Sequence, residues 1–151
     1  HVIIRKKEFI MDVNLLIKNF MIKLSKKWDY GLKAISYIAR QEKRVRISDI
    51  SKELDISESF LRRIVHNFEK KWLLTTIKGR NGGVFIEKNL QEISLYDILL
   101  SLEEDLFITQ CTSGEYCKNQ DICVTTDVLK SLQKGFTALL KLYTLDKIIK
   151  K

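Results

Sequence analysis

The stretch "ISDISKELDISESFLRRIVHNFEKKW", residues 47–72, decides the fold, because apolar residues recur at helical spacing on both sides of the short connection "DIS" at 55–57. Ser48 and Ser57 are the candidate N-caps of the two helices. The second helix is expected to turn an apolar stripe inward, made of Phe60, Leu61, Ile64, Val65, Phe68 and Trp72. Its outward face carries Arg62, Arg63, His66, Asn67 and Lys70. Two helices joined by so short a turn predict a helix-turn-helix.

The next stretch, "LLTTIKGRNGGVFIEK" at 73–88, has two short runs of β-branched and aromatic residues around a glycine-rich centre. This pattern predicts a β-hairpin, in which Asn81, Gly82 and Gly83 supply the positive φ angles of a tight turn. Lys78 and Arg80 place charge at the tip. A hairpin directly after the second helix of a helix-turn-helix makes a winged helix.

Helical patterns flank this region on both sides. A helix capped by Ser25 precedes it, and a helix capped by Ser94, with Asp97 three residues later, follows it. The last long helix carries an apolar seam made of Val128, Leu129, Leu132, Phe136, Leu139, Leu140 and Tyr143. The predicted fold class is therefore mainly α, a winged helix-turn-helix DNA-binding domain with a small β-hairpin wing and a long C-terminal dimerisation helix.

The apolar seam of the last helix needs a partner that covers it. Antiparallel packing against the same helix of a second chain would do so and predicts a homodimer. In the alternative, the seam packs back on its own domain.

Basic residues are concentrated in one part of the chain. Residues 21–90 hold 16 Lys and Arg against 8 Asp and Glu, whereas residues 91–151 hold 7 against 9. A segregated basic block favours a polyanionic partner such as nucleic acid, although a solvated lysine-rich surface is the simpler alternative. We expect an N-terminal extension at 1–20 that lies outside the natural domain, a DNA-binding domain at 21–90, and a region at 91–151 that holds the cysteine loop and the dimerisation helices.

Other classes of protein find little support in the sequence. No stretch approaches the roughly 18 apolar residues of a membrane span, so we expect a cytoplasmic protein with no membrane partner. With His1 and His66 as the two histidines, no nucleotide-binding glycine motif and no paired carboxylates, an enzyme is not expected.

All three cysteines lie in "CTSGEYCKNQDIC", residues 111–123, with five residues between neighbours. The reducing cytosol favours ligands or redox groups over disulfides. The paired spacing of structural zinc is absent, and loops of this kind bind iron-sulfur clusters through thiolates. Thiol redox sensing, zinc and chance remain alternatives at this point.

The order of these features resembles the Rrf-two family of bacterial transcription regulators. The resemblance rests on "MIKLSKKWDYGLKAISYIA" at the amino terminus, "IKGRNGG" in the wing, the cysteine loop, and "YTLDKII" at the end. It runs from Met21 almost to the last residue. It implies a winged-helix homodimer on a palindromic operator in double-stranded DNA.

The resemblance also implies an iron-sulfur cluster, in a two-iron or four-iron form, held by Cys111, Cys117 and Cys123. IscR-like members have a histidine three residues after the third cysteine, where this chain has Thr126. NsrR-like members use an aspartate in the first helix of the other subunit, which matches Asp29 in "WDYGL". A carboxylate is a weak, displaceable iron ligand, so we expect Asp29 as the fourth ligand. His66 is a competing nitrogen ligand, and an ordinary surface aspartate is the alternative for Asp29.

Residues early in a recognition helix reach base edges, which makes Ser59, Arg62 and Arg63 the candidates for base contacts. IscR-like members carry an acidic and an amide residue at the positions of the two arginines, so their operator sequence does not transfer. Lys78 and Arg80 are expected in the minor groove or on phosphates. Asn67 and Lys70 are candidates for backbone contacts. The alternative for each is a solvated surface residue.

Together these features predict a DNA-binding transcriptional regulator, a repressor whose operator affinity is controlled by an iron-sulfur cluster that senses nitric oxide, redox or iron-sulfur status. The first alternative keeps DNA binding and replaces the cluster by a thiol switch or by control through a partner protein. A second is a basic protein-interaction or membrane-surface module that uses residues 1–20.

Overall fold

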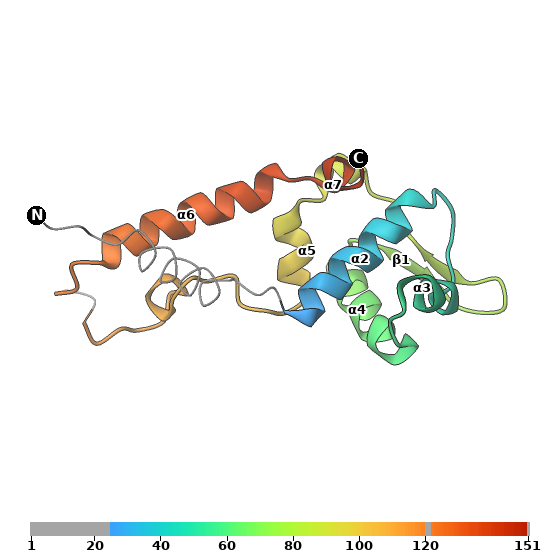
Figure 1. Ribbon diagram of the computed structural model, residues 1–151, viewed down its shortest axis with the longest axis horizontal. Helices are drawn as coiled ribbons and strands as arrows, with labels where there is room; N and C mark the ends of the chain where they lie inside the picture. The colour runs from blue at the N-terminus through green and yellow to red at the C-terminus, as the bar shows by residue number, and fades with distance from the viewer. Residues whose placement is uncertain (1–24, 120–121, 151) are drawn as a thin grey trace, which may run out of the picture.

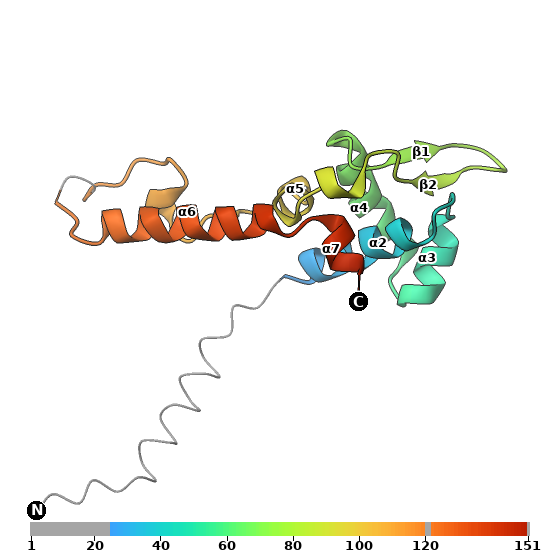
Figure 2. The same ribbon diagram turned by 90° about the horizontal axis from the view of Figure 1, so that it is seen from above.

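The computed structural model describes residues 25–119 and 122–150, and Figures 1 and 2 show its helices and hairpin from two sides. The expected N-terminal extension at 1–20 lies outside the described residues. Three helices, α2 (Lys26–Arg40), α3 (Ile47–Leu54) and α4 (Glu58–Lys70), pack around one apolar core. The core includes Ile35, Ile50, Leu61, Ile64 and Phe68, each no more than 1% exposed.

Helices α3 and α4 form the predicted helix-turn-helix. The turn needs one left-handed residue, and Asp55 adopts it with φ 52° and ψ 45°. The Ser51 hydroxyl donates to the Ile56 carbonyl at 2.7 Å and so holds the turn closed. Ser57 stands at the N-cap of α4, as predicted, although its side chain makes no capping hydrogen bond.

The start of α3 differs from the prediction, because the helix begins at Ile47 and its N-cap is Arg46, not Ser48. The cause is a contact that is distant in sequence. Val45 pairs with Val84 of the hairpin through two backbone hydrogen bonds of 2.9 and 3.0 Å. This pairing keeps Val45 on the edge of the hairpin, and Arg46, still extended at φ −78° and ψ 145°, is the last residue before the helix.

The predicted wing is a two-stranded antiparallel hairpin of β1 (Thr75–Ile77) and β2 (Gly83–Phe85). Its turn differs from the prediction, because the positive φ lies at Gly79 (107°) and not at Asn81, Gly82 or Gly83. Gly82 is required for another reason. A Cβ on this residue would overlap the Ile77 carbonyl oxygen, so only glycine lets the two strands approach.

The prediction that Trp72 belongs to the buried stripe of the recognition helix is wrong, because its side chain is 84% exposed. Helix α4 ends at Lys70, and Trp72 itself has φ 58°, which takes it off the helical path. Leu73 and Leu74 follow and fill the core instead, at 3% and 4% exposure.

Helix α5 (Leu95–Ser101) follows the short turn η1 (Leu90–Glu92) and joins the winged helix to the C-terminal region. Its start carries the predicted capping box, in which the Asp97 backbone N–H donates to the Ser94 side chain and the Ser94 N–H donates to the Asp97 carboxylate. The end of α5 packs tightly on α2, because a Cβ on Gly31 would lie 2.6 Å from Leu102 Cδ1. Gly31 therefore permits the close approach of these helices.

The C-terminal region consists of the turn η2 (Gln110–Thr112), the long helix α6 (Thr126–Leu142) and the short helix α7 (Leu145–Ile149). Figure 1 shows α6 extending away from the winged helix, with the cysteine loop beside its far half. Helix α7 returns to the winged helix. The Leu95 N–H donates to the Tyr143 carbonyl and the Leu145 N–H to the Ile93 carbonyl, both at 2.7 Å. Among the described residues, no helix has the length and hydrophobicity that crossing a bilayer requires.

Candidate functional site

The N-terminal half of α4 carries the residues expected to contact bases. Ser59, Arg62 and Arg63 are all exposed. The Arg62 guanidinium donates to Glu58 at 3.0 Å, and the Arg63 guanidinium lies 5.1 Å from the centre of the Phe60 ring. Both arginines are thus held by neighbours on the same helix and remain open to solvent.

The turn of the wing carries Lys78 and Arg80, both exposed. Sequence reasoning missed a third basic residue beside them. The Arg46 guanidinium donates to the Arg80 backbone carbonyl at 3.3 Å and so braces the turn from the start of α3. The basic run "KRVR" at 43–46 carried the signal for it, but only the Val45–Val84 pairing places that run beside the wing.

The two residues expected to contact the DNA backbone lie farther along α4. Asn67 is half-buried. Lys70 is exposed and lies at the opposite end of the helix from Ser59, where its Nζ is 4.0 Å from the Glu103 carboxylate. The structure therefore does not bring Lys70 together with the base-contact candidates. His66, the competing ligand, is exposed on the same helix, whereas the cysteines lie on the segment between α5 and α6.

The three cysteines are free and half-buried, and they lie on the segment that connects α5 to α6. Cys111 is part of η2, where its sulfur lies 3.1 Å from the Thr109 hydroxyl. Cys123 lies shortly before α6, with its sulfur 3.1 Å from the Thr125 hydroxyl. The hydrogen bond from the Thr125 side chain is the main cause that lowers the pKa of Cys123 to about 7.

The donor set of this loop fits an iron-sulfur cluster in chemistry, because three free thiols on one segment are the ligands such clusters take. Within the described residues, however, no three potential ligands from His, Cys, Asp and Glu gather at one point. The Thr126 hydroxyl, which stands in place of a histidine, is buried and has no hydrogen-bond partner.

Asp29, the expected fourth ligand, lies in the first turn of α2 and is half-exposed. Its carboxylate accepts a hydrogen bond from Lys33 Nζ at 2.7 Å, one turn along the same helix. This ion pair is on the surface and therefore weak. The carboxylate is available to a second chain without the disruption of a buried contact.

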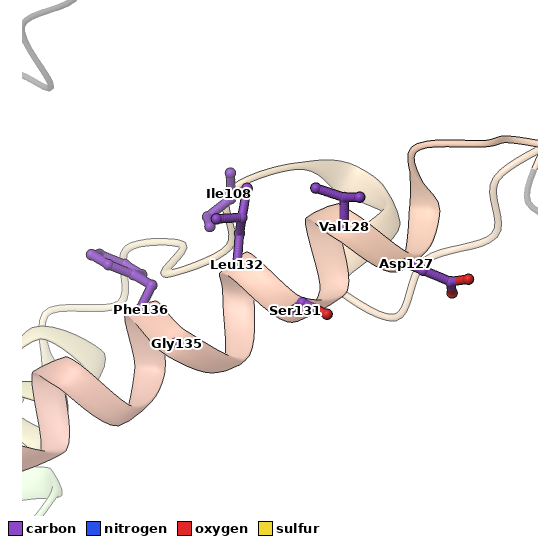
Figure 3. Close-up of a pocket in the computed structure, with 7 residues that line it drawn as sticks. All are labelled: Ile108, Asp127, Val128, Ser131, Leu132, Gly135 and Phe136. Atoms are coloured by element: carbon purple, nitrogen blue, oxygen red, sulfur yellow. The ribbon is translucent and has the colours of Figure 1, made fainter.

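Helix α6 exposes an apolar face along its length. Figure 3 shows Val128, Leu132 and Phe136 on one side of the helix, with Ile108 of the cysteine-loop region beside them. Val128 and Leu132 are 60% and 55% exposed, and Leu139 and Tyr143 continue the face at 50% and 51%. The apolar seam predicted for the last helix is thus left largely uncovered by its own chain, except at Leu140, which is buried at 6% exposure.

Comparison with known protein families identifies the chain. The family described as "Rrf2: Iron-dependent Transcriptional regulator" matches residues 24–151. The chain belongs to the Rrf2 family. Members of the Rrf2 family are DNA-binding transcriptional regulators and not enzymes, so the expected class of function is confirmed.

Curated relatives agree with the Rrf2 assignment. Protein aau3 of Rhizobium meliloti is 31% identical over 85% of this chain and 86% of its own length. The HTH-type transcriptional regulator NsrR of Bacillus licheniformis is 30% identical over 85% and 92%. The HTH-type transcriptional regulator IscR of Pectobacterium atrosepticum is 29% identical over 85% and 79%.

Solved structures show the same fold. T. potens IscR aligns with a TM-score of 0.69 at 24% identity, over 87% of this chain and 89% of its own. CymR, the global cysteine regulator of B. subtilis, aligns with a TM-score of 0.67 at 21% identity, over 85% and 97%. The mainly α winged-helix fold predicted from the sequence is therefore confirmed.

Proposed function

We propose that this Rrf2 protein is a homodimeric repressor that binds a palindromic operator and whose affinity is set by an iron-sulfur cluster. Cys111, Cys117 and Cys123 hold the cluster in this proposal, and Asp29 of the partner subunit supplies the fourth ligand. The observation that carries it is the position of the three free thiols on the one segment between α5, which packs on the winged helix, and α6, which bears the uncovered apolar face.

The surfaces of α4 and the wing support operator binding. Ser59, Arg62 and Arg63 lie where a recognition helix meets base edges, and arginine to guanine is the commonest specific contact. Lys78 and Arg80 at the tip of the wing bind phosphates or enter the minor groove. Asn67 and Lys70 contact the DNA backbone. Lys70 does so after its side chain has moved away from Glu103.

The exposed face of α6 supports dimer formation. Exposed large apolar side chains recur along one face of this 17-residue helix. Contact of such a face with water is unfavourable, and exposed apolar patches commonly mark interaction sites. Two copies of this face packed antiparallel would remove it from water. Each Å² of apolar area buried in this way stabilises the dimer by about 25 cal/mol. The same arrangement gives the two-fold symmetry that a palindromic site requires.

Control by the cluster follows from the chemistry of its ligands. Thiolates hold the cluster firmly, whereas a carboxylate is displaced easily by a small molecule or by loss of iron. When bound, the cluster would supply a redox-active and nitric-oxide-reactive group. The reducing cytoplasm keeps the three thiols available for it. Two-iron and four-iron forms both suit three thiolates and one carboxylate.

The test compares ligand variants purified without oxygen. Iron and acid-labile sulfide are expected in the wild-type protein and absent from Cys117→Ser. Asp29→Ala is expected to retain cluster but to show a changed absorption spectrum and operator affinity. Lys33→Ala is the matched control, because it breaks the same ion pair and leaves the carboxylate in place. If Asp29→Ala kept the wild-type spectrum and affinity, Asp29 would not be a ligand.

The lowered pKa of Cys123 supports a second candidate, a thiol switch without a cluster. A thiol with a pKa of about 7 is largely thiolate under mildly alkaline conditions and is readily oxidised. The fold is also that of CymR, whose description names a cysteine regulator. Absence of iron and sulfide after anaerobic purification, together with an operator affinity that changes on peroxide treatment, would favour this candidate.

A further inference from the structure

The segment that runs from the end of α5 past the first cysteine, residues 103–112 and here called the arm, is attached at both of its ends. Toward the winged helix, the Ser25 hydroxyl donates to the Glu104 carboxylate at 2.5 Å. Between the ends, Leu106 is buried at 5% exposure. Toward α6, the described hydrogen bonds of the arm go to one side chain, Gln133. Figures 1 and 2 show the arm leaving α5 and running alongside α6.

Gln133 binds the arm in the way a neighbouring β-strand would. Its Nε2 donates to the Leu106 carbonyl at 3.0 Å, and its Oε1 accepts from the Ile108 backbone N–H at 2.8 Å. The Thr112 hydroxyl lies 3.1 Å from the same Oε1. The amide of Gln133 supplies the donor and the acceptor that this pair needs, whereas a carboxylate or an amine supplies only half of it.

The two attachments lead to different functional surfaces. Ser25 is the N-cap of α2, and its oxygen also accepts from the Trp28 N–H at 3.1 Å, so the Glu104 contact reaches the first turn of the helix that carries Asp29. Ile108, whose N–H is held by Gln133, places its side chain on the apolar face of α6 (Figure 3). The weak Lys70–Glu103 contact at 4.0 Å adds a link to the end of α4.

We propose that Gln133 and Glu104 are positioning residues that connect the state of the cysteine loop to the DNA-binding half within one chain. This inference rests on the proposed function, because it requires a loop whose state controls operator affinity. It is distinct from the contact through Asp29, which acts between chains. Gln133 holds the arm on both sides of Cys111, at Ile108 and at Thr112. A change at the cysteines therefore moves Ile108 and Leu106, and Glu104 passes that movement to α2.

The experiment uses the full chain with Gln133→Ala, Glu104→Ala and the control Lys134→Ala, which alters an exposed neighbour on α6. The first readout is amide hydrogen exchange of Ile108 in cluster-free protein. Loss of the Gln133 acceptor is expected to speed exchange by about 2- to 12-fold in Gln133→Ala, and Lys134→Ala is expected to leave it unchanged. Circular dichroism checks that each variant is folded, and Glu104→Ala tests the route if Gln133→Ala does not fold.

The second readout is the ratio of operator affinities with and without the cluster. Coupling of this kind typically corresponds to a ratio of about 5 to 150. We expect the ratio to fall toward 1 in Gln133→Ala and Glu104→Ala, with iron and sulfide content retained. A wild-type ratio preserved in both folded variants would overturn the inference and leave the proposed function intact. A ratio of 1 in the wild-type protein would instead contradict the proposed function itself.

Discussion

The Arg62 guanidinium lies 3.0 Å from the Glu58 carboxylate, one turn earlier on the recognition helix α4. Both side chains are well exposed, at 63% and 46%, so the pair contributes little to stability. The ion pair instead affects DNA binding. An arginine that contacts guanine must leave this carboxylate, and the carboxylate itself repels the phosphate backbone.

Replacement of this pair is therefore expected to change operator affinity in opposite directions. Arg62→Ala is expected to lose about 1–3 kcal/mol and to relax specificity at one base position. Glu58→Gln is expected to bind about twofold more tightly, because an exposed pair of this spacing contributes about 0.3–0.5 kcal/mol. Fluorescence anisotropy with a palindromic duplex selected from a random pool, and with a scrambled duplex, measures both effects. If Arg62→Ala discriminated between the two duplexes as well as the wild type does, Arg62 would not read sequence.

Neutralisation of the wing is expected to act on affinity and not on sequence preference. Lys78→Ala/Arg80→Ala should weaken binding to all duplexes alike, because phosphate contacts carry no sequence information. The slope of log affinity against log salt should fall by about 0.9 for each phosphate that the variant no longer neutralises. Lys88→Ala, an exposed lysine beyond the wing, is the control. A salt slope that does not change in the double variant would remove the wing from the interface.

Gly31→Ala is expected to destabilise the fold. The new Cβ would lie 2.6 Å from Leu102 Cδ1, and overpacking of this kind costs about 1–3 kcal/mol. Chemical denaturation measures the free energy of unfolding. Because Leu102→Ala makes room for the methyl group, the double variant should lose less than the sum of the two single losses. Strict additivity would show that this contact does not limit the packing of α2 on α5.

Local signals explain how much of the fold could be predicted. The connection 55–57, the capping box at Ser94 and the hairpin all depend on residues close in sequence, and each lies where its residues predict. The start of α3 was predicted wrongly because of a contact that is distant in sequence. Val45 pairs with Val84 and so moves the start of α3 away from Ser48, and no periodicity reveals a pairing of one residue.

The candidate site shows the same division. The exposed faces of α4 and the wing follow from helical and strand periodicity. The contacts of Gln133 do not, since an isolated glutamine on a helix carries no pattern that marks two backbone partners 25 and 27 residues away. The burial of Trp72 was predicted wrongly for a local reason, because the left-handed φ at this residue takes it off the helical stripe.

Cys123 is expected to react as a thiolate at neutral pH in the cluster-free chain. A pKa lowered to about 7 means that alkylation by iodoacetamide rises through pH 7 and levels off by about pH 8. Thr125→Val removes the main cause and should move the midpoint toward about 8.5, the ordinary value of a free cysteine. Thr125→Ser keeps a hydroxyl and should stay near the wild type. Peptide mass spectrometry assigns the rate to Cys123, and an unchanged midpoint in Thr125→Val would rule out this hydrogen bond as the cause.

The most direct test of cluster-controlled DNA binding is an anaerobic titration with nitric oxide, in which the absorption and Mössbauer spectra and the operator affinity are followed on the same sample. We predict that the cluster spectrum and the operator affinity change together near stoichiometric nitric oxide, by about 5- to 150-fold in affinity. A cluster spectrum that disappears while operator affinity stays constant would contradict the account.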